Sequence, residues 1–218
     1  GQGVHYAKAW DELKALAETW NIPVTTSIEG KSAFPENHPL SLGSGGRANS
    51  RQVKQYLNDA DVIFGVGVSF ALTAFGVPMP ANKDGSKTFI HATLDPIDLN
   101  KDVPVQHGLI GDAKLTLQAL SAEMANYGKA PAEQRAAEPE KIAAIRDAWR
   151  GEWLPKLTSN DTPINPYRVI AELDRMVDKD NVVITHDAGS PRDQTTPFWE
   201  ATAPLSYIGW GKTTQLGY

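Results

Sequence analysis

The sequence contains no cysteine, which removes a whole group of chemistries at once. Disulfide bonds, thiolate nucleophiles, cysteine-ligated iron–sulfur clusters and cysteine zinc sites are all excluded. Long runs of one charge are also missing: 21 basic and 26 acidic side chains are interspersed and give a net charge of −5. This pattern argues against nucleic acid as a partner, because surfaces that bind nucleic acid carry clustered basic residues.

The sequence also lacks a long apolar stretch. The most apolar region, around residues 66–75, is well short of the roughly 20 residues that cross a bilayer. The first residues have neither the basic start nor the apolar stretch of a signal peptide. We therefore predict a cytoplasmic protein with no membrane partner.

Short β-rich runs alternate with segments of helical periodicity along the chain. The β-rich runs are residues 22–26, 61–66, 88–94, 108–110 and 181–185, and the helical segments are residues 7–20, 50–57, 113–124, 141–154 and 167–177. This alternation predicts an α/β fold with a doubly wound parallel sheet, Rossmann-like in its first part. Residues 30–46, rich in Gly, Pro, Ser and Asn, are expected to form a long ordered loop.

Composition divides the chain into three parts. Residues 126–140 are rich in Ala, Pro, Glu and Lys without an apolar period, which is typical of a linker. We predict a first unit over residues 1–125, a linker with a helix over residues 126–163, and the truncated start of a second α/β unit over residues 164–218. In the last predicted helix, over residues 167–177, five apolar side chains are expected to face inward: Val169, Ile170, Leu173, Met176 and Val177.

Four glycine-containing turns have both a functional and a structural interpretation. Gly1-Gln2-Gly3 could cradle a phosphate or simply lead into a helix, and Gly65-Val66-Gly67 is interpreted as a tight strand-to-loop turn. Residues Gly43 to Arg47 could bind an anion or form a structural loop. Gly111-Asp112 resembles the start of a magnesium motif, but helix capping by Asp112 is favoured.

Familiar catalytic patterns are missing. The five histidines include no pair with the i, i+4 spacing of helical metal ligands, and no Gly-x-Ser-x-Gly elbow occurs. His186 and Asp187 are adjacent, so their side chains point to opposite faces of an extended segment, which argues against a working dyad.

Two turns near the end of the chain suggest half of a ligand site. Asp187-Ala188-Gly189-Ser190 follows the strand predicted over residues 181–185, and Thr214-Gln215-Leu216-Gly217 comes about two dozen residues later. Turns at the carboxyl ends of parallel strands gather at one edge of a sheet, where such folds bind ligands. We expect the two turns to lie together.

Residues 30–43, GKSAFPENHPLSLG, closely resemble a loop in the central domain of thiamine-diphosphate-dependent enzymes of the acetolactate synthase, benzoylformate decarboxylase and oxalyl-CoA decarboxylase group. Residues 22–24, 59–67, 94–96 and 111–113 also fall in the family's order. Past the linker, residues 184–189, ITHDAG, are similar to the opening of the family's diphosphate-binding domain. Nearly the whole chain is covered by this resemblance.

The resemblance implies thiamine diphosphate and Mg²⁺ as cofactors. It places the diphosphate on Ala188, Gly189 and Ser190, where glycine permits close approach of backbone N–H donors to an anion.

The same resemblance assigns Thr214, Gln215 and Leu216 to the pyrimidine-binding turn. The Thr214 carbonyl would accept a hydrogen bond from the pyrimidine amino group, and Leu216 would be the wedge that bends the cofactor. The alternative is a strand–helix turn with Leu216 in the core.

Three parts of the family's machinery are expected outside these residues. The activating glutamate belongs to an amino-terminal domain, the magnesium ligands would follow Tyr218, and the first strand of the central sheet should precede Gly1. No catalytic residue and no metal ligand is therefore assigned here, and the stretch alone is expected to be inactive. Ser69 stands where flavin- or ADP-binding members carry an arginine, so we expect neither nucleotide.

The resemblance implies part of an enzyme that acts on 2-oxo acids, as a decarboxylating lyase or an acyl-transferring transferase, and that assembles as a homodimer or homotetramer. A non-catalytic module that binds NAD, FAD or CoA remains an alternative, because such modules share this architecture. A degenerate family member retained for assembly is a third possibility.

Overall fold

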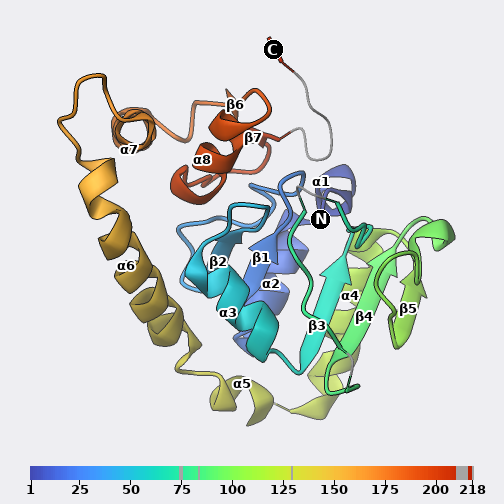
Figure 1. Ribbon diagram of the computed structural model, residues 1–218. Coiled ribbons are helices and arrows are strands. Elements are labelled where there is room, and N and C mark those ends of the chain that lie inside the picture. Colours follow the sequence, from blue (N-terminus) through green and yellow to red (C-terminus); the bar gives the residue numbers. More distant parts are fainter. Residues whose placement is uncertain (74–75, 83, 129, 210–215, 218) are drawn as a thin grey trace.

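The computed structural model describes residues 1–73, 76–82, 84–128, 130–209 and 216–217 (Figure 1). The helices are α1 (Gly3–Tyr6), α2 (Trp10–Trp20), α3 (Arg51–Asp59), α4 (Ala113–Met124), α5 (Ala130–Gln134), α6 (Glu138–Leu157), α7 (Pro166–Met176) and α8 (Ser190–Phe198), with 3₁₀ turns η1 (Pro96–Asp98) and η2 (Ala125–Tyr127). The strands are β1 (Val24–Thr26), β2 (Ser41–Ser44), β3 (Val62–Val66), β4 (Thr88–Thr93), β5 (His107–Ile110), β6 (Ile184–Thr185) and β7 (Tyr207–Ile208).

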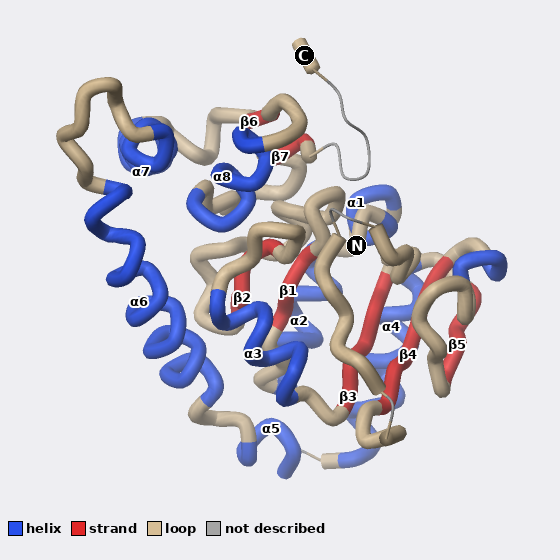
Figure 2. Tube along the Cα trace, in the orientation of Figure 1, coloured by secondary structure: helices blue, strands red, loops and turns tan. Residues whose placement is uncertain are grey.

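All strand pairs among the described residues are parallel. They form the ladders β1-β2, β3-β4-β5 and β6-β7. Figure 2 shows the first five strands side by side in the order β2, β1, β3, β4, β5. The predicted parallel α/β architecture is confirmed. No helix in the described part of the chain is both long and apolar enough to cross a membrane.

Helices cover both faces of this first unit, as a doubly wound sheet requires. Alternate residues of a strand face opposite sides. Val66 and Ala92 pack in one core with residues of α2 and α4, whereas Ile63 and Phe89 pack in a second core with residues of α3 and α6. The two cores therefore lie on opposite faces of β3 and β4.

The helix predicted over residues 113–124 matches α4. Asp112 Oδ1 accepts hydrogen bonds from the backbone N–H groups of Lys114 (2.9 Å) and Leu115 (3.1 Å). These bonds satisfy two donors of the first turn. Helix capping by Asp112 is therefore confirmed.

Two expectations for the first unit need correction. The helix predicted over residues 7–20 begins only at Trp10, because Lys8 adopts a positive φ of 49° and separates α1 from α2. The loop predicted over residues 30–46 contains β2, which pairs with β1 from Val24 opposite Ser41 to Thr26 opposite Ser44. The sequence of this strand, SLGS, consists mostly of small residues and therefore does not indicate a strand.

Three expectations for the later part of the chain also change. The predicted linker over residues 126–140 includes α5 and the start of α6, and α6 continues past Pro155. Of the five side chains predicted to face inward over residues 167–177, Ile170 and Val177 do pack against buried clusters. The prediction is wrong for Val169, Leu173 and Met176, which are 39%, 43% and 71% exposed. The elements α8, β6 and β7 lie above the ends of β1 and β2, and α7 lies beside the upper end of α6 (Figure 1).

Gly1 lies between the carboxyl ends of β1 and β3. Its amino nitrogen donates to the Val66 carbonyl oxygen at 2.8 Å. A Cβ placed on Gly30, in the turn after β1, would lie 2.9 Å from the Gly1 carbonyl carbon. Among the described strands, β1 pairs only with β2 and β3 pairs only with β4, so each has an edge without a partner.

Candidate cofactor site at the start of helix α8

The predicted diphosphate turn connects β6 to the amino end of α8. Gly189 precedes the helix with φ 82° and ψ −139°, a conformation that favours glycine. Gly189 and Ser190 are exposed. Because the first N–H groups of a helix have no intrahelical acceptor and carry partial positive charge, this turn presents donors to an anion.

The turn also touches the last described residues of the chain. Gly217 N donates to both carboxylate oxygens of Asp187, at 3.0 and 3.1 Å. Leu216 is 77% exposed, so it does not belong to the core. Thr214 and Gln215 lie outside the described residues, and the roles predicted for them and for Leu216 stay predictions.

His186 is buried between this turn and β7. Its Nδ1 lies 2.9 Å from the Asp187 carbonyl oxygen, which can only accept, so Nδ1 carries the proton. Burial lowers the pKa of His186, and its Nε2 is buried without a hydrogen-bond partner in the described structure. The Asp187 carboxylate bonds Gly217 instead of this imidazole, in agreement with the argument against a His–Asp dyad.

Tyr207 of β7 ties this small sheet to α8. Its ring lies 5.4 Å from the His186 ring, centroid to centroid, and its hydroxyl lies 3.1 Å from Thr195 Oγ1. Burial raises the pKa of Tyr207 to about 12. The phenol therefore stays neutral and serves as a hydrogen-bonding partner for the helix.

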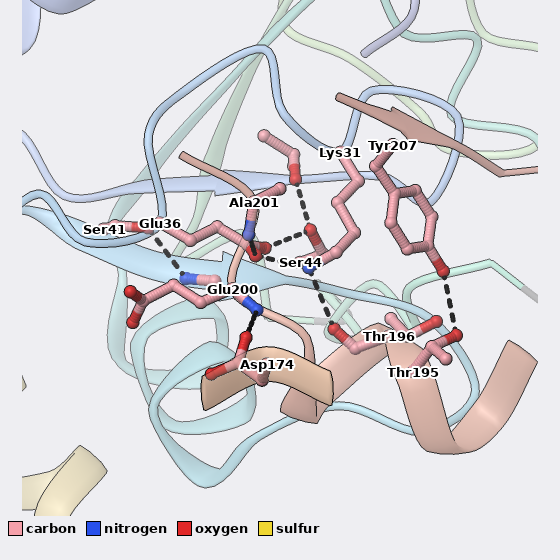
Figure 3. A network of polar contacts seen from close by, with 12 residues as sticks. Lys31, Glu36, Ser41, Ser44, Asp174, Thr195, Thr196, Glu200, Ala201 and Tyr207 are labelled. Atoms are coloured by element: carbon pink, nitrogen blue, oxygen red, sulfur yellow. Dashed lines mark hydrogen bonds and ion pairs between the residues drawn. The ribbon is translucent and has the colours of Figure 1, made fainter. Parts of the chain in front are cut away.

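A buried polar network joins this second unit to the first (Figure 3). The Lys31 ammonium contacts the Glu36 carboxylate and donates to the Thr196 carbonyl oxygen at 3.1 Å. Glu36 Oε1 accepts from Ser44 Oγ at 2.6 Å, and Glu36 Oε2 accepts from Ala201 N at 2.8 Å. Burial lowers the pKa of Lys31, and the neighbouring Glu36 opposes this shift.

The composition of residues 30–46 predicts an ordered loop and residues 30–43 carry the family resemblance, but neither feature indicates this network. Lys31 and Glu36 stand in a loop rich in small residues, and the partners Thr196 and Ala201 are 165 residues away in sequence. Only the proximity of the two units brings these groups together.

The two amino-terminal glycine turns pack against each other. Gly3 N donates to the Gly67 carbonyl oxygen at 2.8 Å, and a Cβ on Gly67 would lie 2.7 Å from Gly3 Cα. Close backbone contact thus accounts for these glycines. In the loop from Gly43 to Arg47, Gly45 N donates to the Thr26 carbonyl oxygen at 2.7 Å, which favours the structural interpretation there too. No group of three potential metal-binding side chains occurs within the described ranges.

Comparison with known proteins extends this picture. Residues 1–120 match the family model described as thiamine pyrophosphate enzyme, central domain. Over 225 residues the chain is 28% identical to a probable acetolactate synthase large subunit of Methanococcus aeolicus and 27% identical to the acetolactate synthase isozyme 3 large subunit of Escherichia coli K12; each alignment covers 100% of this chain and 37% of the relative.

A third relative carries a different name. The 3D-(3,5/4)-trihydroxycyclohexane-1,2-dione hydrolase of Bacillus cereus AH820 is 26% identical over 233 residues, which cover 95% of this chain and 35% of the relative. The chain thus spans little more than a third of the length of these curated relatives. Because the family model covers more than half of the chain and includes the whole parallel sheet of the first unit, this chain belongs to the thiamine pyrophosphate enzyme family.

Proposed function

We propose that this chain is the central part of a thiamine-diphosphate- and Mg²⁺-dependent enzyme that acts on 2-oxo acids by decarboxylation or acyl transfer. The observation that carries the proposal is the exposed Gly189–Ser190 turn at the start of α8, which follows a chain segment belonging to this cofactor's family. Two relatives are named as acetolactate synthases. These names support 2-oxo acids as the substrate class of the whole enzyme.

The residues of the turn suit a diphosphate. Gly189 has no side chain to hinder an approaching phosphate, and nothing lies within 4 Å of the position where its Cβ would stand. Ser190 adds a hydroxyl and a backbone N–H at the helix start. In this proposal Ala188, Gly189 and Ser190 bind the diphosphate, as the family resemblance implies.

Charge supports the requirement for magnesium. Asp187 and Asp193 place two carboxylates beside the turn, and Asp193 is paired with the Arg192 guanidinium. A divalent cation would reduce the repulsion between a bound diphosphate and these carboxylates. We place the ligands of that cation outside this chain.

The second turn would hold the other end of the cofactor. Asp187 fixes Gly217 through two hydrogen bonds, and the neighbouring Leu216 projects an exposed apolar side chain. Such a side chain is available to pack against a bound ring. Thiamine diphosphate supplies, when bound, a nucleophilic carbon for attack on a carbonyl group. Thr214, Gln215 and Leu216 would orient its pyrimidine.

Isothermal calorimetry of the full-length protein tests the proposal. We expect thiamine diphosphate to bind in the presence of Mg²⁺ and to bind much more weakly after chelation with EDTA. Thiamine without phosphates is the matched control for the diphosphate turn. Binding of ADP without any response to thiamine diphosphate would favour a nucleotide module instead. Absence of binding to either ligand would favour a degenerate member.

Substrate class needs a separate measurement. Carbon dioxide release from pyruvate and from 2-oxobutyrate, with cofactor and Mg²⁺ present, distinguishes 2-oxo acid chemistry from the cyclic-dione hydrolysis named for the Bacillus relative. Analysis of the organic product then separates a lyase, which releases an aldehyde, from a transferase, which joins the acyl group to a second carbonyl. Gel filtration with light scattering tests the proposed homodimer or homotetramer.

A further inference from the structure

Lys31 and Glu36 form an ion pair that is almost completely withdrawn from solvent. Lys31 is 1% exposed and Glu36 is 8% exposed. Every charged atom in the pair has a partner: the ammonium contacts Glu36 and the Thr196 carbonyl oxygen, while the carboxylate also accepts from Ser44 and Ala201. Figure 3 shows these groups converging from β2, the loop before it and the segment around the end of α8.

Stability alone does not explain such a pair. Removing two charges from water costs free energy that their attraction barely returns, and apolar residues of similar volume often stabilise a fold as well or better. A buried ion pair in which every polar atom has a hydrogen-bond partner differs from an apolar contact, because hydrogen bonds are directional. Such a pair therefore permits only one arrangement of the two segments that it joins.

The pair joins the two units at the end of α8. Thr196 lies in the last turn of α8, and Ala201 follows the helix. Ala201 is held twice, since its N–H donates to the Glu36 carboxylate at 2.8 Å and its carbonyl accepts from Glu36 N at 2.9 Å. The loop of the first unit therefore fixes both the position and the direction of the chain that leaves α8.

The opposite end of α8 carries the diphosphate turn. The nine residues of α8 span about 13 Å at ~1.5 Å per residue, so a rotation of the helix at one end displaces the turn at the other. The Lys31 ammonium also lies 5.2 Å from the centroid of the Tyr207 ring, and Tyr207 contacts Thr195 of α8 and the His186 ring beside the turn. A contact at one end of the helix thus sets the place of Gly189 and Ser190 at the other.

We propose that Lys31 and Glu36 are positioning residues that set the orientation of α8 and thereby align the turn at residues 187–190 with its anionic ligand. The inference rests on the proposed function. Neither side chain touches the ligand; both act through the helix. Removal of the pair leaves both units folded but lets the turn adopt several positions, so that affinity for the diphosphate falls while the fold persists.

The decisive variant replaces both charges at once. Lys31→Met/Glu36→Leu removes the ion pair without leaving an unpaired buried charge, but it also takes a partner from the Thr196 carbonyl and the Ala201 N–H, so its melting temperature is expected to fall slightly and much less than that of Lys31→Met. Its dissociation constant for thiamine diphosphate with Mg²⁺ is expected to rise roughly tenfold to a hundredfold, as for a small misplacement of a binding group. The single variant Lys31→Met, which leaves Glu36 unpaired, should lose both thermal stability and affinity.

Arg51→Ala is the matched control. The Arg51–Glu152 ion pair also links the first unit to a later helix, but its side chains are 47% and 55% exposed. Its removal should change neither the melting temperature nor the dissociation constant appreciably. Hydrogen exchange without cofactor gives an independent readout: amides of residues 187–193 should exchange faster in Lys31→Met/Glu36→Leu than in Arg51→Ala.

The outcomes separate the two proposals. If the unmodified protein does not bind thiamine diphosphate, the proposed function fails and the positioning role fails with it. If the unmodified protein binds the cofactor and Lys31→Met/Glu36→Leu binds it equally well, the proposed function stands and the positioning role is overturned. A fall in affinity that merely follows a fall in melting temperature would assign the pair a structural role and also overturn the inference.

Discussion

At the scale of single residues, Gly189 combines an unusual backbone conformation with a place in the candidate cofactor site. Its φ of 82° with ψ of −139° is open to glycine and strained for other residues. The space around its Cβ position is empty, so a methyl group there meets no steric clash. Any cost of substitution therefore reports the backbone conformation itself.

We predict that Gly189→Ala lowers the free energy of unfolding by ~1–3 kcal/mol, because alanine resists this backbone conformation. Urea unfolding followed by circular dichroism measures the change. Gly151 in α6 also has open space at its Cβ position, but it lies within a helix. Gly151→Ala should instead raise the free energy of unfolding by ~0.5–1 kcal/mol. Equal effects of the two substitutions would contradict the strained conformation at Gly189.

At the scale of elements, the sequence predicts best where local signals agree. Asp112 followed by an apolar period defines α4, and the apolar run before Gly65 and Gly67 defines β3. The sequence predicts structure poorly where contacts between distant segments decide the conformation. Ser41–Ser44 has no strand-like composition and becomes β2 only by pairing with β1. Lys8 breaks the first helix although its sequence neighbours suit one.

The candidate site shows the same division. The turn at Ala188, Gly189 and Ser190 follows from local sequence and family resemblance, because small residues after a strand mark such turns. The Lys31–Glu36 contact with Thr196 and Ala201 does not, since it depends on how two units pack. The apolar stripe of α7 is covered only in part: Ile170 packs in a core cluster, whereas Leu173 and Met176 are exposed. Helical periodicity identifies an apolar face without identifying what covers it.

The edges of β1 and β3 lead to a prediction about the strand expected before Gly1. Gly1 enters between the ends of these two strands, and each has an edge without a partner among the described strands. We predict that the full-length protein places a parallel strand there. Backbone amides of β1 and β3 should then exchange at least ~10 times more slowly than in the 218-residue chain.

Strand β4 provides the internal reference for that measurement. It already pairs with β3 on one side and β5 on the other. Its amides should therefore change only as much as global stability changes, and the additional protection should be confined to β1 and β3. Uniform protection across all three strands would speak against a strand in this position.

At the scale of the whole molecule, an aromatic cluster forms a second connection between the parts of the chain. The Phe198 ring, at the end of α8, stacks on Trp149 of α6 with 5.1 Å between centroids and an interplanar angle of 10°. Trp153 and Tyr167 contact the same ring at 5.1 and 5.4 Å. Through α6, which also packs against α3, this cluster couples α7 and α8 to the first unit.

We predict that the chain unfolds in a single transition and that Phe198→Ala divides it into two. Phe198 is 4% exposed, so its truncation removes about 3 kcal/mol or more of packing free energy, and the loss falls on the contact between the units. Hydrogen exchange in urea should then show the backbone amides of α7 and α8 losing protection at a lower urea concentration than those of β3 and β4. Tyr127→Ala serves as the control, because its side chain is 73% exposed and its removal should leave the two signals coincident. Coincident transitions in Phe198→Ala would show instead that the remaining contacts between the units suffice to keep them cooperative.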